Sequence, residues 1–171
     1  MALTGQEQAY LTAQPRGRLA TVTPDGSPQN KPVGFRYNPG LGTIDIYGFN
    51  MEHSQKFRNV QANPRVAFVV DDAPGQGAEG MRFMEIRGVA ETAAGQDPPG
   101  HTSAHLIRIH PRRVVSWNLD PHRPGLRTRD VDAAQPGEEP RGPQSRGEQP
   151  PGRQSPGERS PAEQRAEEQE R

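Results

Sequence analysis

Residues 17–38 of the chain read GRLATVTPDGSPQNKPVGFRYN, and this stretch decides the fold. In residues 17–23 (GRLATVT) apolar and polar side chains alternate, which is typical of a strand with one buried face. Residues 24–27 (PDGS) form a turn sequence, and extended structure resumes in residues 28–37. The sequence therefore predicts a β-hairpin.

Five later stretches predict further strands. They are residues 43–48 (TIDIYG), 65–71 (RVAFVVD), 81–92 (MRFMEIRGVAET), 106–110 (LIRIH) and 114–119 (VVSWNL). Strict alternation in the first predicts one solvent-facing side, and the apolar centre of the second is typical of a strand covered on both faces. With the hairpin, these strands predict a mainly β fold, a compact barrel of six or seven strands.

Two short helices are expected beside the strands. One covers residues 4–14, whose first letters, TGQE, have the spacing of a capping box. The other extends from an Asn50 cap through Asn59 or Gln61. It stops at residues 63–64 (NP), because the residue before a proline avoids the helical region.

Composition divides the chain at about residue 120. Residues 1–120 are long enough to form a single hydrophobic core. Residues 121–171 are rich in proline, glycine and charge, contain no aromatic residue, and have Leu126 and Val131 as their only large aliphatic side chains. Such a segment cannot bury enough apolar surface to offset the entropy lost on ordering. We therefore expect one folded domain, residues 1–120, and a disordered tail, residues 121–171.

Charge and composition also exclude several kinds of protein. The formal net charge is +0, so the basic surface of a nucleic-acid binder is not expected. The chain has no cysteine, which excludes disulfides, thiolate catalysis and cysteine metal sites. The longest apolar run, residues 66–70, is far too short to span a bilayer, and the N-terminus lacks the apolar core of a signal peptide. We expect a cytoplasmic protein without a nucleic-acid or membrane partner.

The only lysines of the chain, Lys31 and Lys56, are candidates for a binding site. Arginine is otherwise the cation of this sequence, and lysine supplies a compact ammonium for a phosphate or a ring carbonyl. On a helix, Lys56 and Asn59 share a face while Arg58 points partly elsewhere. Ser54 and Lys56 can reach one phosphate if both lie in the first turn, where backbone N–H groups are free. The alternative is an ordinary amphipathic helix with a solvated basic side.

Three other patterns are weak evidence for a functional site. Gly75, Gly77 and Gly80 match the letters of a GxGxxG loop, but a strand is expected after them, so we interpret this segment as a flexible hairpin connection. His101 and His105 have the spacing of zinc ligands, with no glutamate or cysteine to complete a site. No G-x-S-x-G elbow is present. We therefore expect no metal site and no hydrolase chemistry, and no catalytic residue is assigned.

Two stretches are the most specific of all, residues 19–29 (LATVTPDGSPQ) and the K-x-R-N-V-x-x-N-P-R-V block of residues 56–66. Together with the order of the predicted elements over residues 5–119, they resemble the pyridoxamine 5′-phosphate oxidase-like split-barrel family, especially its actinobacterial branch of deazaflavin-dependent oxidoreductases. This resemblance implies a homodimer of split β-barrels of the FMN-binding type, with the cofactor at the subunit interface.

The resemblance also implies residue roles at the phosphate end of the cofactor. Lys56 and Ser54 would contact the phosphate, and Arg58 and Asn59 would support that segment. Some deazaflavin relatives carry a second basic residue where this chain has Ser54, so affinity for a highly charged cofactor tail is left open.

At the ring end, Lys31, Pro32 and Val33 would lie against the ring system and offer backbone hydrogen bonds to its polar edge, and Trp117 would lie beside the ring. The chain lacks the C-terminal arginine–histidine element of true pyridoxamine-phosphate oxidases, so we do not expect it to oxidise vitamin B6.

The activity implied is transfer of a hydride from reduced coenzyme F420 to a small organic acceptor, chemistry that belongs to the cofactor while the protein binds and orients it. The alternatives are an FMN-dependent oxidoreductase, a non-catalytic flavin- or haem-binding carrier or sensor on the same fold, and an interaction protein that works through its tail.

Overall fold

The computed structural model describes residues 3–131, apart from residues 76, 78–79 and 96–97. The chain divides into two units, residues 1–136 and 137–171, and every described residue lies in the first. No helix in the described part is long and apolar enough to cross a lipid bilayer. The tail predicted to be disordered lies outside the described residues from residue 132 onward.

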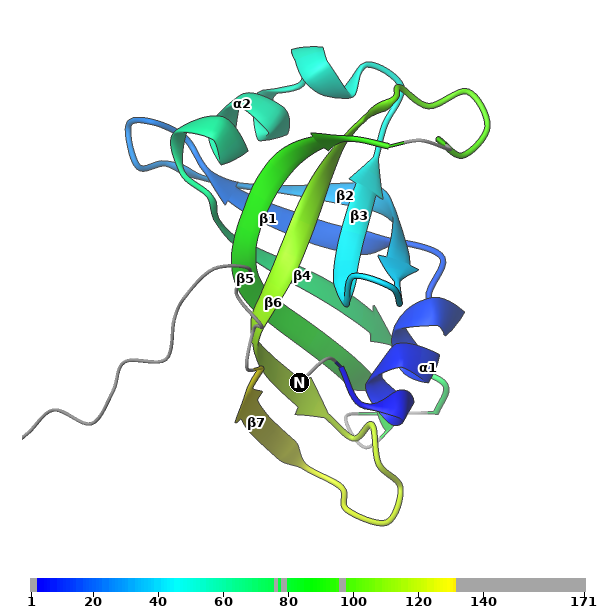
Figure 1. Ribbon diagram of the computed structural model, residues 1–171. Helices are drawn as coiled ribbons and strands as arrows, with labels where there is room; N and C mark the ends of the chain where they lie inside the picture. Colours follow the sequence, from blue (N-terminus) through cyan, green and yellow to red (C-terminus); the bar gives the residue numbers. More distant parts are fainter. Residues whose placement is uncertain (1–2, 76, 78–79, 96–97, 132–171) are drawn as a thin grey trace, which may run out of the picture. The chain divides into compact units, whose positions relative to one another are not determined.

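In the described residues, seven strands, two α-helices and one short 3₁₀-helix follow one another (Figure 1). In order, they are α1 (Gly5–Ala13), β1 (Gly17–Val22), β2 (Pro28–Asn38), β3 (Thr43–Tyr47), η1 (Met51–His53), α2 (Gln55–Ala62), β4 (Arg65–Asp72), β5 (Arg82–Ala94), β6 (His105–Trp117) and β7 (Leu126–Asp130).

A single antiparallel sheet forms the body of the domain, with the strand order β3-β2-β1-β4-β5-β6-β7. The sheet closes because β3 also pairs with β6, where Ile44 lies opposite Ile109. The first part of β6 thus closes a six-stranded barrel, and its last part, residues 113–117, diverges to pair with β7 outside the barrel (Figure 1). The mainly β split barrel predicted from the sequence is confirmed.

The predicted β1–β2 hairpin is also confirmed. Leu19 pairs with Lys31, and the register is unbroken to the turn. In the turn, the N–H of Thr23 donates to the carbonyl of Ser27 at 3.0 Å. Gly26 has a φ of 88°, in the left-handed region where glycine is favoured because it has no Cβ.

A bulge bends β5 and β6 where the sequence predicted two separate strands. Arg87 pairs with Arg113 and Gly88 with Pro111, so Arg112 is the extra residue. Proline is tolerated at a bulge because no ladder donor is required there. A Cβ on Gly88 would lie 2.4 Å from the carbonyl oxygen of His110, so this close approach needs glycine. Residues 105–117 are therefore one bent strand.

The core lies inside the barrel and is built from alternate residues of the strands. Ile44, Ile46, Phe68, Ile86 and Ile107 have no solvent exposure at all. Burial of each such side chain contributes about 1.5–3 kcal/mol. The core is therefore the main source of stability.

The outer face of β3 does not face solvent as the sequence predicted. Asp45 points away from the barrel interior, yet only 3% of its surface is exposed. Arg108 on β6 covers it with a bidentate pair, Nε to Oδ1 at 2.9 Å and Nη2 to Oδ2 at 2.8 Å. Thr43 donates to the same carboxylate at 3.3 Å. An alternating sequence pattern cannot reveal this cover, because Arg108 comes from a distant strand.

The sequence predicted that both faces of β4 are covered, and the structure differs. Val66, Phe68 and Val70 are buried, but Ala67 and Val69 are partly exposed on the outer face within this chain. Burial therefore alternates along β4 although the sequence is continuously apolar.

The predicted capping box at the start of α1 is confirmed. The N–H of Glu7 donates to Thr4 Oγ1 at 3.3 Å, and the Thr4 N–H donates to the Glu7 carboxylate at 2.8 Å. At the other side of the helix, the Tyr10 hydroxyl donates to Asp72 at 3.2 Å and lies 3.1 Å from the carbonyl of Arg82. Helix α1 is thus fastened to the ends of β4 and β5.

The predicted boundary at residue 120 is wrong, because the fold continues to residue 131. β7 pairs with β6 from Leu126 to Asp130, and Val131 is buried with 7% exposure. Arg129 forms an ion pair with Glu7 on α1. Composition did not predict this strand because β7 has little apolar content of its own. It is held by pairing with the edge of β6 and by the contact of Arg129 with Glu7, more than a hundred positions earlier.

Candidate functional site

Helix α2 begins four residues later than predicted, and Ser54 rather than Asn50 is its N-cap. The Ser54 Oγ accepts the Phe57 N–H at 3.4 Å and donates to the carbonyl of Met51 at 2.7 Å. Asn50 precedes η1 instead and makes no side-chain cap bond. The predicted arrangement with Ser54 and Lys56 in or beside the first turn is nevertheless present.

Asn59 fixes the rotation of α2 over the barrel. It is fully buried, and its side-chain amide donates to Thr21 Oγ1 at 3.0 Å and to Gln29 Oε1 at 3.2 Å. Its side-chain oxygen accepts from Gln55 at 2.8 Å. These bonds connect the helix to β1 and β2. Thr21 and Gln29 were missed, although strand alternation places both on the inward face of the hairpin.

Helical spacing places Lys56 on the same side of α2 as Asn59 and Val60, which are buried against the barrel. It is half-buried, whereas Arg58 is exposed. The shared face predicted for Lys56 and Asn59 is therefore confirmed. Arg58 donates to the carbonyl of His53 at 2.7 Å and to Gln55 at 2.8 Å. Its guanidinium is already engaged by the adjoining chain.

Lys56 differs in its electrostatic setting from the arginines that form ion pairs in the described part of the chain. Six arginines are paired with carboxylates: Arg18, Arg82, Arg87, Arg108, Arg113 and Arg129. No ion pair joins Lys56 to an acidic residue within the described part of the chain. Burial lowers the pKa of its ammonium below that of a solvated lysine. A half-buried cation without an anion, in the first turn of a helix, is suited to bind a phosphate.

A free strand edge lies next to this helix. β2 pairs with β3 only from Gly34 onward, so residues 28–33 have β1 on one side and no strand on the other among the described residues. Pro28 and Pro32 both lie in this segment. Proline is accommodated in a sheet when its nitrogen faces an unpaired edge, which places the backbone groups of Pro28, Asn30 and Pro32 there. That edge offers carbonyl oxygens and the N–H of Asn30.

The three ring-contact candidates on β2 therefore differ in what they offer. Lys31 and Pro32 are exposed, while Val33 is buried with 6% exposure and belongs to the core. Pro32 has no N–H to donate. Hydrogen bonding from this segment to a ring would come from the backbone carbonyls and from the neighbouring Asn30 amide.

Trp117 does not converge with Lys31 and Lys56 in one chain. β6 begins at His105, whose ring lies 6.0 Å from that of Phe57 on α2, and Trp117 is twelve positions further on. At 3.3 Å per residue this is about 40 Å of strand. The indole nitrogen of Trp117 is buried and has no hydrogen-bond partner among the described residues. Seven of the eight candidates thus lie on β2, on α2 or at its N-cap, and Trp117 lies apart at the end of β6.

The weaker sequence patterns form no site in the described residues. After Gly75, Gly77 and Gly80 comes β5, not a helix, so the dinucleotide-loop interpretation is rejected. No group of three or more metal-ligating side chains is present in the part described. His105 lies near Glu52 and Ser103, which also bond to each other at 2.6 Å.

Comparison with known proteins agrees with this fold. A model of the family described as pyridoxamine 5′-phosphate oxidase matches residues 3–118. A 5a,11a-dehydrotetracycline/5a,11a-dehydrooxytetracycline reductase from Streptomyces rimosus is 44% identical over 140 residues, which cover 80% of this chain and 99% of the relative.

Two solved structures share the fold at lower identity. A conserved hypothetical protein from Mycobacterium tuberculosis matches with a TM-score of 0.55 and 22% identity over 70% of this chain and 87% of its own. A heme binding protein from Mycobacterium smegmatis matches with a TM-score of 0.56 and 16% identity over 76% of this chain and 59% of its own. By its match over most of its length and by its similarity to the reductase, this chain belongs to the pyridoxamine 5′-phosphate oxidase family of oxidoreductases.

Proposed function

We propose that this protein binds a reduced deazaflavin, coenzyme F420, and uses it to reduce an activated carbon–carbon double bond in an organic acceptor. The observation that carries the proposal is Lys56, a half-buried ammonium on the barrel-facing side of α2 without a carboxylate partner in the described chain. A cation left unpaired at such a position costs stability, and a bound phosphate would offset that cost.

The chain's own residues would bind and orient the cofactor. Lys56 and the first-turn N–H groups of α2 would hold its phosphate, with Ser54 shaping the turn as N-cap and Asn59 fixing the rotation of the helix. The free edge of β2 around Lys31 would face the polar edge of the ring. When bound, the reduced deazaflavin supplies the hydride, and a proton from solvent completes reduction of the acceptor.

A homodimer belongs to the proposal for two reasons. The outer face of β1, β4 and β5 carries an apolar groove of about 420 Å³ that includes Ala20, Val22 and Ala67. A second subunit would cover this face. Trp117 is also too far along β6 to reach the phosphate end in its own chain, so it would contribute to a shared site only across such an interface.

The acceptor class follows from the related reductase. The Streptomyces relative is named for reduction of dehydrotetracyclines, and we propose a polycyclic or smaller enone of comparable chemistry as acceptor here. Because a diffusible reduced cofactor has to be regenerated by metabolism, the proposed reaction takes place in the cytoplasm.

Two measurements test the proposal. First, the purified full chain is titrated separately with oxidised coenzyme F420 and with FMN, and fluorescence quenching is followed, while light scattering gives the mass. Saturable F420 binding by a dimer is expected. Binding of FMN alone would replace the deazaflavin by the FMN alternative, and no binding of either would refute the proposal.

Second, the protein is mixed with reduced F420 and 5a,11a-dehydrotetracycline, and the return of oxidised cofactor is followed. Acceptor-dependent oxidation is expected. Binding of cofactor without oxidation by this or simpler enones would favour the carrier or sensor alternative.

A further inference from the structure

A second cavity lies at the opposite side of the domain from α2, between α1 and the β6–β7 hairpin. Its volume is about 320 Å³, within the range of small-ligand sites. Val114 and Leu119 provide apolar floor, and Gln6, Arg123, Arg127 and Arg129 bring polar groups to the wall. We call it the α1–β7 pocket. None of the residues placed at the cofactor phosphate lines it.

The pocket already binds one carboxylate, that of Glu7. Arg129 donates Nε–H to Glu7 Oε1 at 2.8 Å and pairs through Nη2 with the second oxygen. The Glu7 side chain is about one-tenth exposed. Burial raises the pKa of this carboxyl, but the bonds from Arg129 and the Thr4 N–H outweigh that effect and the pKa lies below its usual value. The wall is therefore shaped for a carboxylate.

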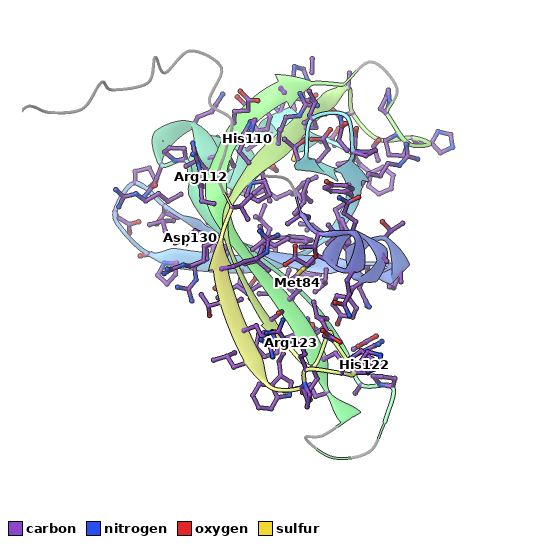
Figure 2. The ribbon with its side chains drawn as sticks, turned by 60° about the horizontal axis from the view of Figure 1, so that its bottom comes forward. Met84, His110, Arg112, His122, Arg123 and Asp130 are labelled. Carbon is purple, nitrogen blue, oxygen red and sulfur yellow. The ribbon has the colours of Figure 1, made fainter. Side chains whose placement is uncertain are left out.

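Two more guanidinium groups, those of Arg123 and Arg127, line the pocket. The Asp120 carboxylate lines it too and accepts the N–H of His122 at 2.9 Å. Arg127 is two positions before Arg129, so alternation places both on the β7 face that looks toward α1. Arg127 donates Nε–H to the carbonyl of Arg123 at 3.1 Å, and no ion pair joins it to an acidic residue among the described residues. Arg123 has no ion pair among the described residues. Figure 2 shows Arg123 beside His122 in the β6–β7 connection, away from His110 and Arg112.

We propose that the α1–β7 pocket is an anion site, in which Arg123 and Arg127 bind the carboxylate or phosphate of a small organic molecule. Guanidinium groups suit both anions because their planar N–H pairs match two oxygens. The apolar floor of Val114 and Leu119 would contact the uncharged part of the ligand. Glu7 occupies the third guanidinium and limits the pocket to one further anionic group.

The test uses the full chain and two probes, malonate for carboxylates and inorganic phosphate for phosphates. Isothermal titration calorimetry measures affinity, and fluorescence of Trp117, the only tryptophan, reports on the neighbourhood because Ser116 and Leu119 line the pocket. Saturable binding of at least one probe is expected. The Arg123→Gln/Arg127→Gln variant should bind it at least tenfold more weakly.

Two further variants separate this site from other cations. Arg16→Gln removes an exposed arginine that does not line the pocket and should leave the affinity unchanged. Glu7→Gln should strengthen binding at least threefold, because it frees Arg129 for the ligand. Circular dichroism verifies that each variant is folded.

Three results would overturn the proposal: no saturable binding of either probe, equal affinity in the double arginine variant, or loss of binding in Arg16→Gln. If only phosphate binds, the ligand class narrows to phosphates, and if only malonate binds, to carboxylates. Either of these outcomes supports the site.

Discussion

The side-chain amide of Asn59 donates to Thr21 Oγ1 at 3.0 Å and so joins α2 to β1 across 38 positions of the sequence. Replacing Asn59 with leucine leaves the buried Thr21 hydroxyl without its partner and also removes the bonds to Gln29 and Gln55. We expect Asn59→Leu to lower the free energy of unfolding by about 2–4 kcal/mol. Urea denaturation measures this change.

Arg58→Ala is the matched control, because Arg58 is on the same helix but exposed. Its loss should cost less than about 1 kcal/mol. Equal destabilisation by the two substitutions would show that Asn59 has no special part in docking the helix.

The Asp45–Arg108 pair closes the barrel between β3 and β6, so it should matter more than exposed pairs. Asp45→Ala leaves a largely buried guanidinium without its anion, and we expect a loss of about 3–5 kcal/mol. Glu85→Ala breaks the exposed pair with Arg87 and should cost less than about 1 kcal/mol.

The double substitution Asp45→Leu/Arg108→Leu tests whether the loss of stability comes from an unpaired buried charge or from changing the side chains at these positions. Removing both charges should recover much of the loss, since no unpaired charge remains. A double variant that is less stable than Asp45→Ala would contradict this explanation.

Glu7 should make the stability of the domain depend on pH. Burial alone would raise its pKa, but Arg129 and the backbone of Thr4 lower it in the folded state. A lowered folded-state pKa means that the contribution is fully present above the unfolded-state pKa, near 4.5, and is lost as pH falls through the folded value.

The difference in unfolding free energy between the natural chain and Glu7→Gln measures this contribution. We expect it to be constant from pH 7 to about pH 5 and to shrink toward pH 3. A difference that grows with acidification would reverse the assigned sign.

Two truncations test where the folded domain ends. Deleting residues 121–171 removes β7, the Arg129–Glu7 pair and buried Val131, and should lower the melting temperature by several degrees. Deleting residues 132–171 leaves all of these in place and should leave melting unchanged. Identical melting of both truncated proteins would show that β7 contributes nothing.

Local signals in the sequence predicted local structure well. The capping box at Thr4, the turn at Gly26 and the stop before Pro64 depend on residues only a few positions apart, and the structure has all three. The N-cap of α2 was misplaced because Asn50 and Ser54 are both good caps, and the intervening 3₁₀ turn is not encoded by apolar spacing.

Contacts between distant residues could not be predicted in this way. Asp45 is buried by Arg108, 63 positions away, and β7 is fixed by Glu7, 122 positions away. The separation of Trp117 from Lys56 arises from the length of β6 and its bulge, which residue identity alone does not reveal.

The most direct test of the account is the affinity of the cofactor for Lys56→Met, with Arg58→Met as the control on the exposed side of the same helix. Methionine keeps the length of the side chain and removes the ammonium. The account predicts that Lys56→Met weakens F420 binding by more than about 1.5 kcal/mol, over tenfold, with stability unchanged or higher because a desolvated charge is gone. Arg58→Met should bind nearly as the natural chain does. An unchanged dissociation constant in Lys56→Met would show that Lys56 is only a surface charge.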